Sequence, residues 1–181
     1  AGLPNPSTYR AWLSTSTTDA YCHVQGLTGF RNGGCGGAPL PGGGPWYQVN
    51  GVTQFSADLE TLTGTGRVVY RQVLFDEFAT AITDEWEGAY WTGSEPSGRL
   101  SAAHCADWTS ISSAASGCSG TSVAGSYSWS FWLWVSCSAQ LRLLCLEPGE
   151  VRDILGTPGL REVVQFTHSN WPPCAWLCAP K

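Results

Sequence analysis

Apolar and polar side chains alternate along residues 8–15, and this alternation predicts a β-strand. Tyr9, Ala11 and Leu13 occupy one set of alternate positions, which is the two-residue period of a half-buried strand. Runs rich in aromatic and β-branched residues predict more strands. These further strands are expected at residues 67–78, 88–94, 126–137 and 141–147.

Short helices are predicted where capping residues flank a polar and apolar pattern. Ser56 can cap a helix over residues 57–63, and Gly64 can end it. After residue 147, Thr157 followed by Pro158 indicates two short helices within residues 147–166.

A loop rich in Gly and Pro follows the first predicted strand. It covers residues 21–46, where the density of these residues argues against regular structure. Cys22 and Cys35 lie within it and can close a short loop, which would contribute about 3 kcal/mol by loop-entropy estimates. We therefore predict a local disulfide between them.

The size and cysteine content of the chain indicate one exported domain. A chain of 181 residues that is 43% hydrophobic can bury one sizeable core. We assign residues 1–147 to this domain and residues 148–181 to a C-terminal extension. Eight cysteines among few charges are typical of secreted, disulfide-bonded proteins. The chain contains no methionine, so we expect that Ala1 was exposed by removal of a signal peptide, and that the protein is extracellular or at the cell surface.

The charge pattern excludes several classes of partner. Nine basic against fourteen acidic residues give a net charge of −5 without a Lys/Arg cluster, so nucleic acid and anionic membranes are poor partners. No stretch approaches the roughly 20 apolar residues that span a bilayer, so membrane insertion is not expected.

His104 lies in the segment GRLSAAHCADW, residues 98–108, which looks at first like the general-base segment of a trypsin-like protease. Triad chemistry also needs a nucleophilic serine and a buried carboxylate. The nearest serine context, residues 117–121, lacks the acidic residue and the second glycine of the protease loop, and it does not fit the Gly-x-Ser-x-Gly elbow. We predict that His104 is not catalytic and that the chain is not an enzyme.

Two groups of residues have metal-binding chemistry, and each has a simpler interpretation. The acidic residues within 76–87 could gather around calcium, but they lack EF-hand spacing, and the alternative is a solvated acidic loop. Cys174 and Cys178 with His168 are a weak zinc pattern, because a lone C-x3-C has no second ligand pair. Disulfide pairing is favoured there. No metal or other cofactor is predicted.

Four tryptophans are the candidate ligand or interface residues. Trp132 and Trp134 share one side of the strand predicted at residues 126–137, and Trp171 and Trp176 lie in the extension. Exposed indoles on the strand would form a stacking platform for sugar rings or an interface anchor, whereas buried ones would belong to the core. The core interpretation is favoured for the strand.

Two longer segments resemble a known family. They are YWTGSEPSGRLSAAHCADW, residues 90–108, and SCSAQLRLLCLE, residues 136–147, in which a Trp-x-Gly turn precedes a Cys-x-x-Trp segment and two later cysteines. The pattern is similar to the collagen endostatin domain and to secreted bacterial domains of unassigned function, over about residues 6–147. The resemblance implies an α+β, C-type lectin-like (endostatin-like) disulfide-bonded domain with long loops. It also implies a disulfide between Cys105 and Cys137.

Departures from the family limit what the resemblance implies. The paired calcium-binding elements of sugar-binding C-type lectins are missing, so any binding is expected to be independent of calcium. The family's N-terminal strand and helix are also absent, and with the helix goes the usual partner of Cys145. We predict that Cys145 pairs with Cys174 or Cys178, and we count Cys118 among the disulfide cysteines. The sheet edge left by the missing strand is expected to be bare, which favours a homo-oligomer or filament.

These expectations favour extracellular recognition or adhesion as the function. A rigid scaffold with variable loops and no visible catalytic set is suited to bind a glycan or a protein through loops and aromatic side chains. The alternative is a structural subunit of an extracellular homo-oligomeric assembly or filament. A compact monomer with a concave aromatic pocket would favour the first function, and exposed tryptophans beside a missing edge element would favour the second.

Overall fold

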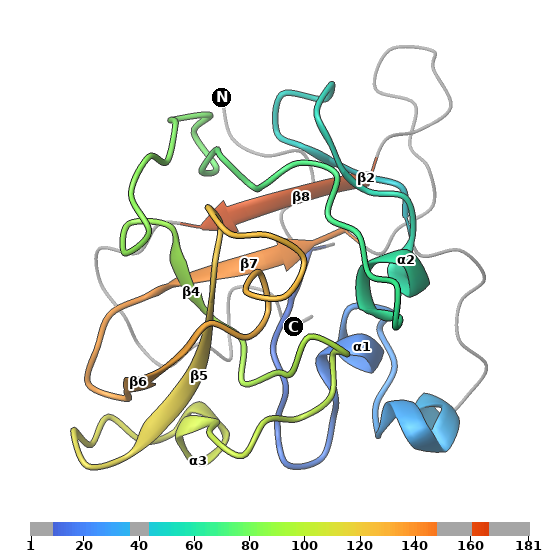
Figure 1. Ribbon diagram of the computed structural model, residues 1–181. Coiled ribbons are helices and arrows are strands. Elements are labelled where there is room, and N and C mark those ends of the chain that lie inside the picture. The colour runs from blue at the N-terminus through green and yellow to red at the C-terminus, as the bar shows by residue number, and fades with distance from the viewer. Residues whose placement is uncertain (1–8, 37–43, 148–160, 167–181) are drawn as a thin grey trace.

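The protein has a mixed α+β fold that is mostly sheet, with a few short helices (Figure 1). The computed structural model describes residues 9–36, 44–147 and 161–166, and for 161–166 the backbone only. The strands are β1 (Arg10–Ala11), β2 (Trp46–Gln48), β3 (Gln54–Ser56), β4 (Ala89–Trp91), β5 (Ser116–Thr121), β6 (Leu133–Ser136), β7 (Arg142–Leu146) and β8 (Arg161–Phe166). The helices are α1 (Ala20–His23), the 3-10 segment η2 (Arg31–Gly36), α2 (Leu59–Thr63) and α3 (Cys105–Trp108).

β7 is paired along both of its sides in an eight-stranded sheet. The strand order is β3-β2-β8-β7-β4-β5-β6, and β1 pairs with β7 beyond the end of β4. The register places Leu143 between Trp91 of β4 and Phe166 of β8. Figure 1 shows β7 and β8 side by side. The sheet ends at β3 and at β6.

The position of β8 corrects two expectations. The capping pattern at Thr157 and Pro158 predicted a short helix over residues that instead form β8, antiparallel to β7 and parallel to β2. A bare edge was also expected where the family's first strand is missing, but the edge of β7 opposite β4 is covered by β8 of the same chain. Backbone groups that are already paired offer no template to a neighbouring chain. An oligomer of this protein would therefore need another surface.

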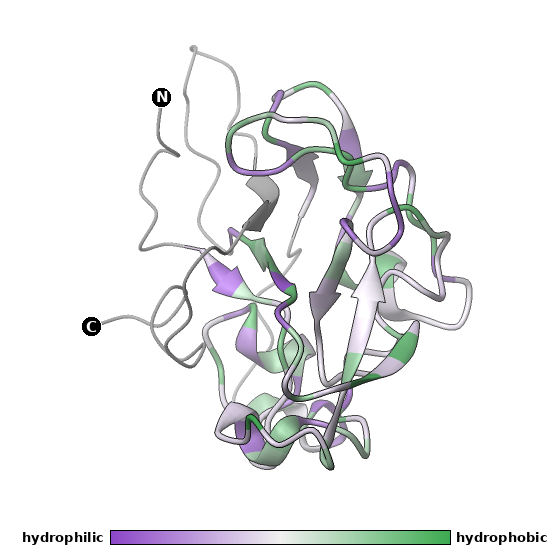
Figure 2. Ribbon diagram, turned by 90° about the vertical axis from the view of Figure 1, so that its left-hand side faces the viewer, coloured by the Kyte–Doolittle hydropathy of each residue, from purple (hydrophilic) through white to green (hydrophobic). Residues whose placement is uncertain are grey.

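Two apolar clusters form the core, and the β1 segment contributes to both. Tyr9 and Leu13 belong to one cluster, and Trp12 belongs to the other, where its ring lies 4.7 Å from that of Trp129. The indole N–H of Trp12 donates to Ser130 Oγ at 2.9 Å. The segment predicted as a half-buried strand is thus buried on both sides and forms only a two-residue strand. Figure 2 shows hydrophobic positions on strands and loops alike.

The hydrophobic pattern located the other elements in part. β4, β7 and α2 lie within predicted elements, although Asp58 rather than Ser56 caps α2, accepting a bond from Thr61 N–H at 2.6 Å. Residues 67–78 form no strand, and only β6 forms from residues 126–137. β5 was not predicted, because its sequence SGCSGT is poor in strand-forming residues.

Two disulfides join pairs of described cysteines. Cys22–Cys35 closes the Gly-rich loop, with Cα atoms 5.3 Å apart. Cys105–Cys137 connects α3 to the residue after β6, with Cα atoms 5.6 Å apart. Both predicted pairings are present in the structure.

The remaining cysteines give one correction. Cys118 was counted among the disulfide cysteines, but its thiol is free and fully buried on β5. Burial raises the pKa of this thiol above its ordinary value. Cys145 is disulfide-bonded. Its predicted partners, Cys174 and Cys178, lie outside the described residues.

Candidate functional site

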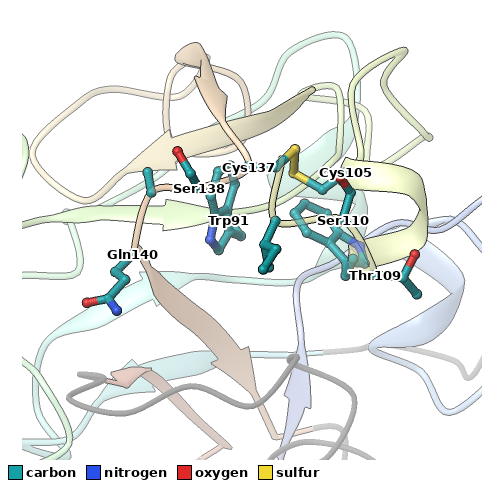
Figure 3. A pocket seen from close by; sticks show the side chains of 10 residues that line it. Trp91, Cys105, Thr109, Ser110, Cys137, Ser138 and Gln140 are labelled. Atoms are coloured by element: carbon teal, nitrogen blue, oxygen red, sulfur yellow. A yellow bond between two sulfur atoms is a disulfide. The ribbon is translucent and has the colours of Figure 1, made fainter. Parts of the chain in front are cut away.

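The chain segments that follow Cys105 and Cys137 are the two walls of a pocket. Cys105 and residues 108–111 line one wall, residues 137–140 line the other, and the disulfide joins the two (Figure 3). Trp91 at the end of β4 completes the lining. The pocket volume is about 630 Å³, within the range of about 300–1,000 Å³ that is typical of small-molecule sites.

Two indole rings line this pocket. The ring centroids of Trp91 and Trp108 are 5.6 Å apart and the planes are tilted by 56°, which is favourable geometry for an aromatic pair. The indole N–H of Trp108 donates to the Ser14 carbonyl at 2.8 Å and so fixes the ring. Glycines make room for both rings. A Cβ on Gly93 would lie 2.6 Å from the Trp108 ring, and one on Gly117 would lie 2.8 Å from the Trp91 ring.

The wall that carries Trp108 is a left-handed turn. Cys105, Ala106, Asp107 and Trp108 have φ angles of 49°, 50°, 53° and 65°. Each non-glycine residue in this region costs about 1–2 kcal/mol, and such residues normally occur singly. Strained backbone of this kind clusters at ligand sites and persists only where surrounding contacts hold it.

Contacts from three directions hold the turn in place. The disulfide anchors Cys105, at its start. Ser16 donates from its N–H and its hydroxyl to the two carboxylate oxygens of Asp107, at 2.6 and 2.5 Å. These two bonds hold the pKa of Asp107 below its ordinary value, because they favour the charged carboxylate. The N–H of Asp107 in turn donates to His104 Nδ1 at 3.0 Å.

The rest of the described lining combines neutral polar side chains with apolar ones. Thr109 and Ser110 lie on one wall, and Ser138 and Gln140 lie on the other (Figure 3). Ile111, which is 85% exposed, also lines the pocket. None of the described residues that line the pocket is Asp, Glu, Lys, Arg or His. The site can therefore stack and hydrogen-bond a ligand but offers it no ion pair.

The predicted candidate tryptophans do not line this pocket. Trp134 on β6 is 61% exposed and Trp132 is half-buried, so the core interpretation is wrong for Trp134. Trp132 packs edge to face against the exposed Trp86, with ring centroids 5.0 Å apart. Trp171 and Trp176 lie outside the described residues.

His104 contributes to the left-handed turn. Its Nδ1 accepts the Asp107 N–H and also lies 3.0 Å from Asp107 Oδ1. An imidazole nitrogen that accepts an N–H carries no proton, so the contact with Oδ1 is not an ion pair in that tautomer. The side chain is 24% exposed. The hydrogen bond from the Asp107 N–H therefore holds the imidazole of His104 against the turn.

Two of the acidic residues within 76–87, Asp76 and Asp84, bind the backbone of their own loop. Asp76 Oδ1 accepts from the N–H groups of Phe78 and Thr80 at 2.9 and 2.8 Å, and Asp84 caps the next turn in the same way. In the part of the chain that the structure describes, no group of three or more His, Cys, Asp or Glu residues is placed to hold a metal ion. The zinc pattern of the extension lies outside that part.

Trp91, Trp108 and Gln140 were not predicted as site residues, although the sequence contains a signal for the pocket. The disulfide implied by the resemblance brings Cys105 beside Cys137. The residues that follow each cysteine must then lie close together, which points to two facing loops. Trp108 ends the Cys-x-x-Trp segment and is thereby placed in one of them.

Comparison of the chain with protein-family models, with curated proteins and with solved structures finds no match. Within the described ranges, no helix is both long enough and apolar enough to cross a membrane. The pocket geometry is therefore the basis for the function proposed next.

Proposed function

We propose that this chain is an extracellular recognition module that binds its ligand in the pocket between residues 105–111 and 137–140. The observation that carries the proposal is the half-buried indole of Trp108, packed on the buried ring of Trp91, in a concave site of ligand size whose described lining is uncharged. The wall of the site is fixed before a ligand arrives, which reduces the entropy lost on binding. The environment of His104 fits a binding site better than a catalytic one, because its Nδ1 already accepts the Asp107 N–H within the turn.

The fold and location belong to the same proposal. We propose a C-type lectin-like, endostatin-like fold, and a secreted or cell-surface protein. The Cys105–Cys137 bridge supports the fold, as does the way Gly93 of the Trp-x-Gly turn makes room for Trp108 of the Cys-x-x-Trp segment. Disulfides form and persist in oxidising compartments, which supports the location.

A pair of matched surface variants tests the proposed site. Ile111→Asp places a charge in the pocket lining at a side chain that is 85% exposed, and Val52→Asp places the same charge on an 81% exposed side chain in the loop between β2 and β3. Both changes leave the core untouched. The wild type and both variants would be applied to arrays of glycans and of extracellular proteins.

We expect the wild type and Val52→Asp to bind the same ligands, and Ile111→Asp to lose at least about tenfold in affinity, because burying an unpaired carboxylate is costly. Equal binding by Ile111→Asp would place the site elsewhere. Absence of any bound glycan or protein would contradict the proposal as a whole.

The β6 edge favours a second candidate function, a structural subunit of an extracellular assembly. β6 ends the sheet, and its residues Leu133 and Trp134 are 39% and 61% exposed. An apolar edge strand can pair with a second chain. Light scattering on concentrated protein tests this: a stable oligomer that Trp134→Lys converts to a monomer would support it, and a monomeric wild type would exclude it.

A further inference from the structure

We infer that the pocket lined by Trp91 and Trp108 takes an uncharged saccharide ring; this inference rests on the proposed function, because it names the ligand class of the same site. It is drawn from the chemistry of the lining. The lining offers apolar ring surface, neutral hydrogen-bonding groups and no charge.

The first argument is the state of the indoles. The N–H of Trp108 already donates to the Ser14 carbonyl, so this ring presents apolar surface to a ligand rather than a hydrogen-bond donor. The C–H groups on one face of a pyranose ring form a flat apolar surface of similar size, which packs against an aromatic ring. Because Trp91 packs against Trp108 at 5.6 Å, the ring surface is held in one orientation.

The second argument is the polar lining on the two walls. Hydroxyl groups of Thr109, Ser110 and Ser138 can each donate and accept, and the amide of Gln140 does both through separate atoms. Sugar hydroxyls likewise donate and accept. A ring resting on an indole would direct its equatorial hydroxyls outward, toward walls such as these.

The third argument is charge. The described lining residues include no ionisable side chain, since Cys105 and Cys137 form a disulfide. A sulfated, sialylated or cationic ligand would lose hydration in the pocket without gaining an ion pair, which is unfavourable. The overall net charge of −5 adds to the penalty for an anion. An uncharged saccharide ring loses little hydration free energy in the pocket and is not repelled by the net negative charge.

The lining also has no carboxylate, so binding in this pocket would need no calcium bridge between protein and sugar. The rigid wall supports affinity in another way. A turn held by the disulfide and by Ser16 does not have to be ordered when the ligand binds.

Calorimetric titration with defined saccharides tests the inference. The probes are short neutral gluco-, galacto-, manno- and N-acetylglucosamine oligosaccharides, with sialyllactose and a heparin-derived tetrasaccharide as charged counterparts, each with and without EDTA. The variants are Trp108→Ala, which removes the ring, and Gln140→Ala, which removes one exposed amide. Trp134→Ala is the control for loss of an indole outside the pocket. Trp108→Ala removes a ring that packs on the core and can therefore also destabilise the fold. Gln140→Ala removes only an exposed side chain, so it tests the pocket without that effect.

We expect at least one neutral oligosaccharide to bind, in EDTA as well. Gln140→Ala should weaken binding about three- to tenfold, the loss of one neutral hydrogen bond, Trp108→Ala should weaken it further, and Trp134→Ala should leave it unchanged.

Two results would overturn the inference and differ in what they leave standing. If only charged saccharides or a protein bind, and Ile111→Asp still abolishes that binding, the ligand class is wrong and the proposed site stands. If neither a saccharide probe nor a protein of the array binds, or if binding responds to Trp134→Ala and not to the pocket variants, both the ligand class and the proposed site are wrong.

Discussion

Single glycines decide how closely the rings and the disulfide of the pocket pack. Gly117 on β5 faces the Cys105–Cys137 bridge and Trp91, and a Cβ there would lie 2.7 Å from Cys105 Sγ. Contacts this short force neighbours to move, and here the neighbours are a disulfide and a buried ring. The shape of the pocket therefore depends on a residue that is not part of its described lining.

We expect Gly117→Ala to lower the free energy of unfolding by about 1–3 kcal/mol, because it overpacks this part of the core. Urea denaturation measures the change. Gly66→Ala is the control, since a Cβ at Gly66 meets no atom within 4 Å, and it should raise the free energy of unfolding by about 0.4–1 kcal/mol because the unfolded chain loses entropy. Equal effects of the two substitutions would contradict the packing described for Gly117.

His23 gives the core a dependence on pH. It is half-buried in α1 with Nδ1 3.0 Å from the Ala11 carbonyl. Burial lowers the pKa of its imidazole, and the nearby charge of Arg10 lowers it further, although the Ala11 carbonyl opposes the shift. In the unfolded chain His23 takes up a proton at about pH 6.5, and in the folded chain it does so only at lower pH. The contribution of the neutral imidazole to the free energy of unfolding is therefore complete above about pH 6.5 and is lost as the pH falls below it.

Replacing His23 by Asn should remove part of this pH dependence. The Asn amide N–H can donate to the Ala11 carbonyl but does not titrate. We expect the melting temperature of the wild type to fall more between pH 7.5 and pH 5 than that of His23→Asn. If the two proteins lose the same amount, the neutral imidazole does not have this role.

Among the elements, apolar runs and one helix end could be predicted from the sequence, and the elements set by long-range contacts could not. The apolar residues of β4 and β7 mark those strands, and Gly64 marks the end of α2, although Asp58 rather than the predicted Ser56 caps its start. The left-handed turn has the sequence Cys-Ala-Asp-Trp, with no glycine to signal positive φ. Its conformation depends on a disulfide and on Ser16, distant in sequence. β8 likewise exists through its pairing with β7 and β2.

The strain in the turn predicts an unusual response to glycine. Ala106 is exposed with a φ of 50°, a conformation that costs an L-residue about 1–2 kcal/mol and a glycine almost nothing. After the larger backbone entropy of glycine in the unfolded chain is subtracted, Ala106→Gly should raise the free energy of unfolding by up to about 1 kcal/mol. Ala102→Gly, at an exposed position without positive φ, should lower it by about 0.4–1 kcal/mol. A loss of stability in both variants would contradict the left-handed turn.

At the scale of the whole molecule, the sheet joins residues from the predicted domain and the predicted extension. β8 lies between β2 and β7, so the chain beyond residue 147 contributes to the same sheet as the first 147 residues. The even number of cysteines in the sequence did not reveal that Cys118 stays reduced. Burial of Cys118 at 0% exposure protects its thiol.

Peptide mapping without reduction checks the cysteine framework. We expect Cys145 to be joined to Cys174 or Cys178, and Cys118 to react with an alkylating reagent only after denaturation, because its thiol is buried. Alkylation of Cys118 in the native protein would contradict its burial. A bridge from Cys118 to any other cysteine would contradict the free thiol.

The most direct test of the central claim, that the pocket between residues 105–111 and 137–140 is the recognition site, is an NMR titration of the ¹⁵N-labelled protein with its tightest ligand from the arrays. The account predicts that shift changes concentrate in those two walls and at the indole N–H signals of Trp91 and Trp108. Shift changes centred on Trp86, Trp132 and Trp134, with the pocket signals unmoved, would contradict it.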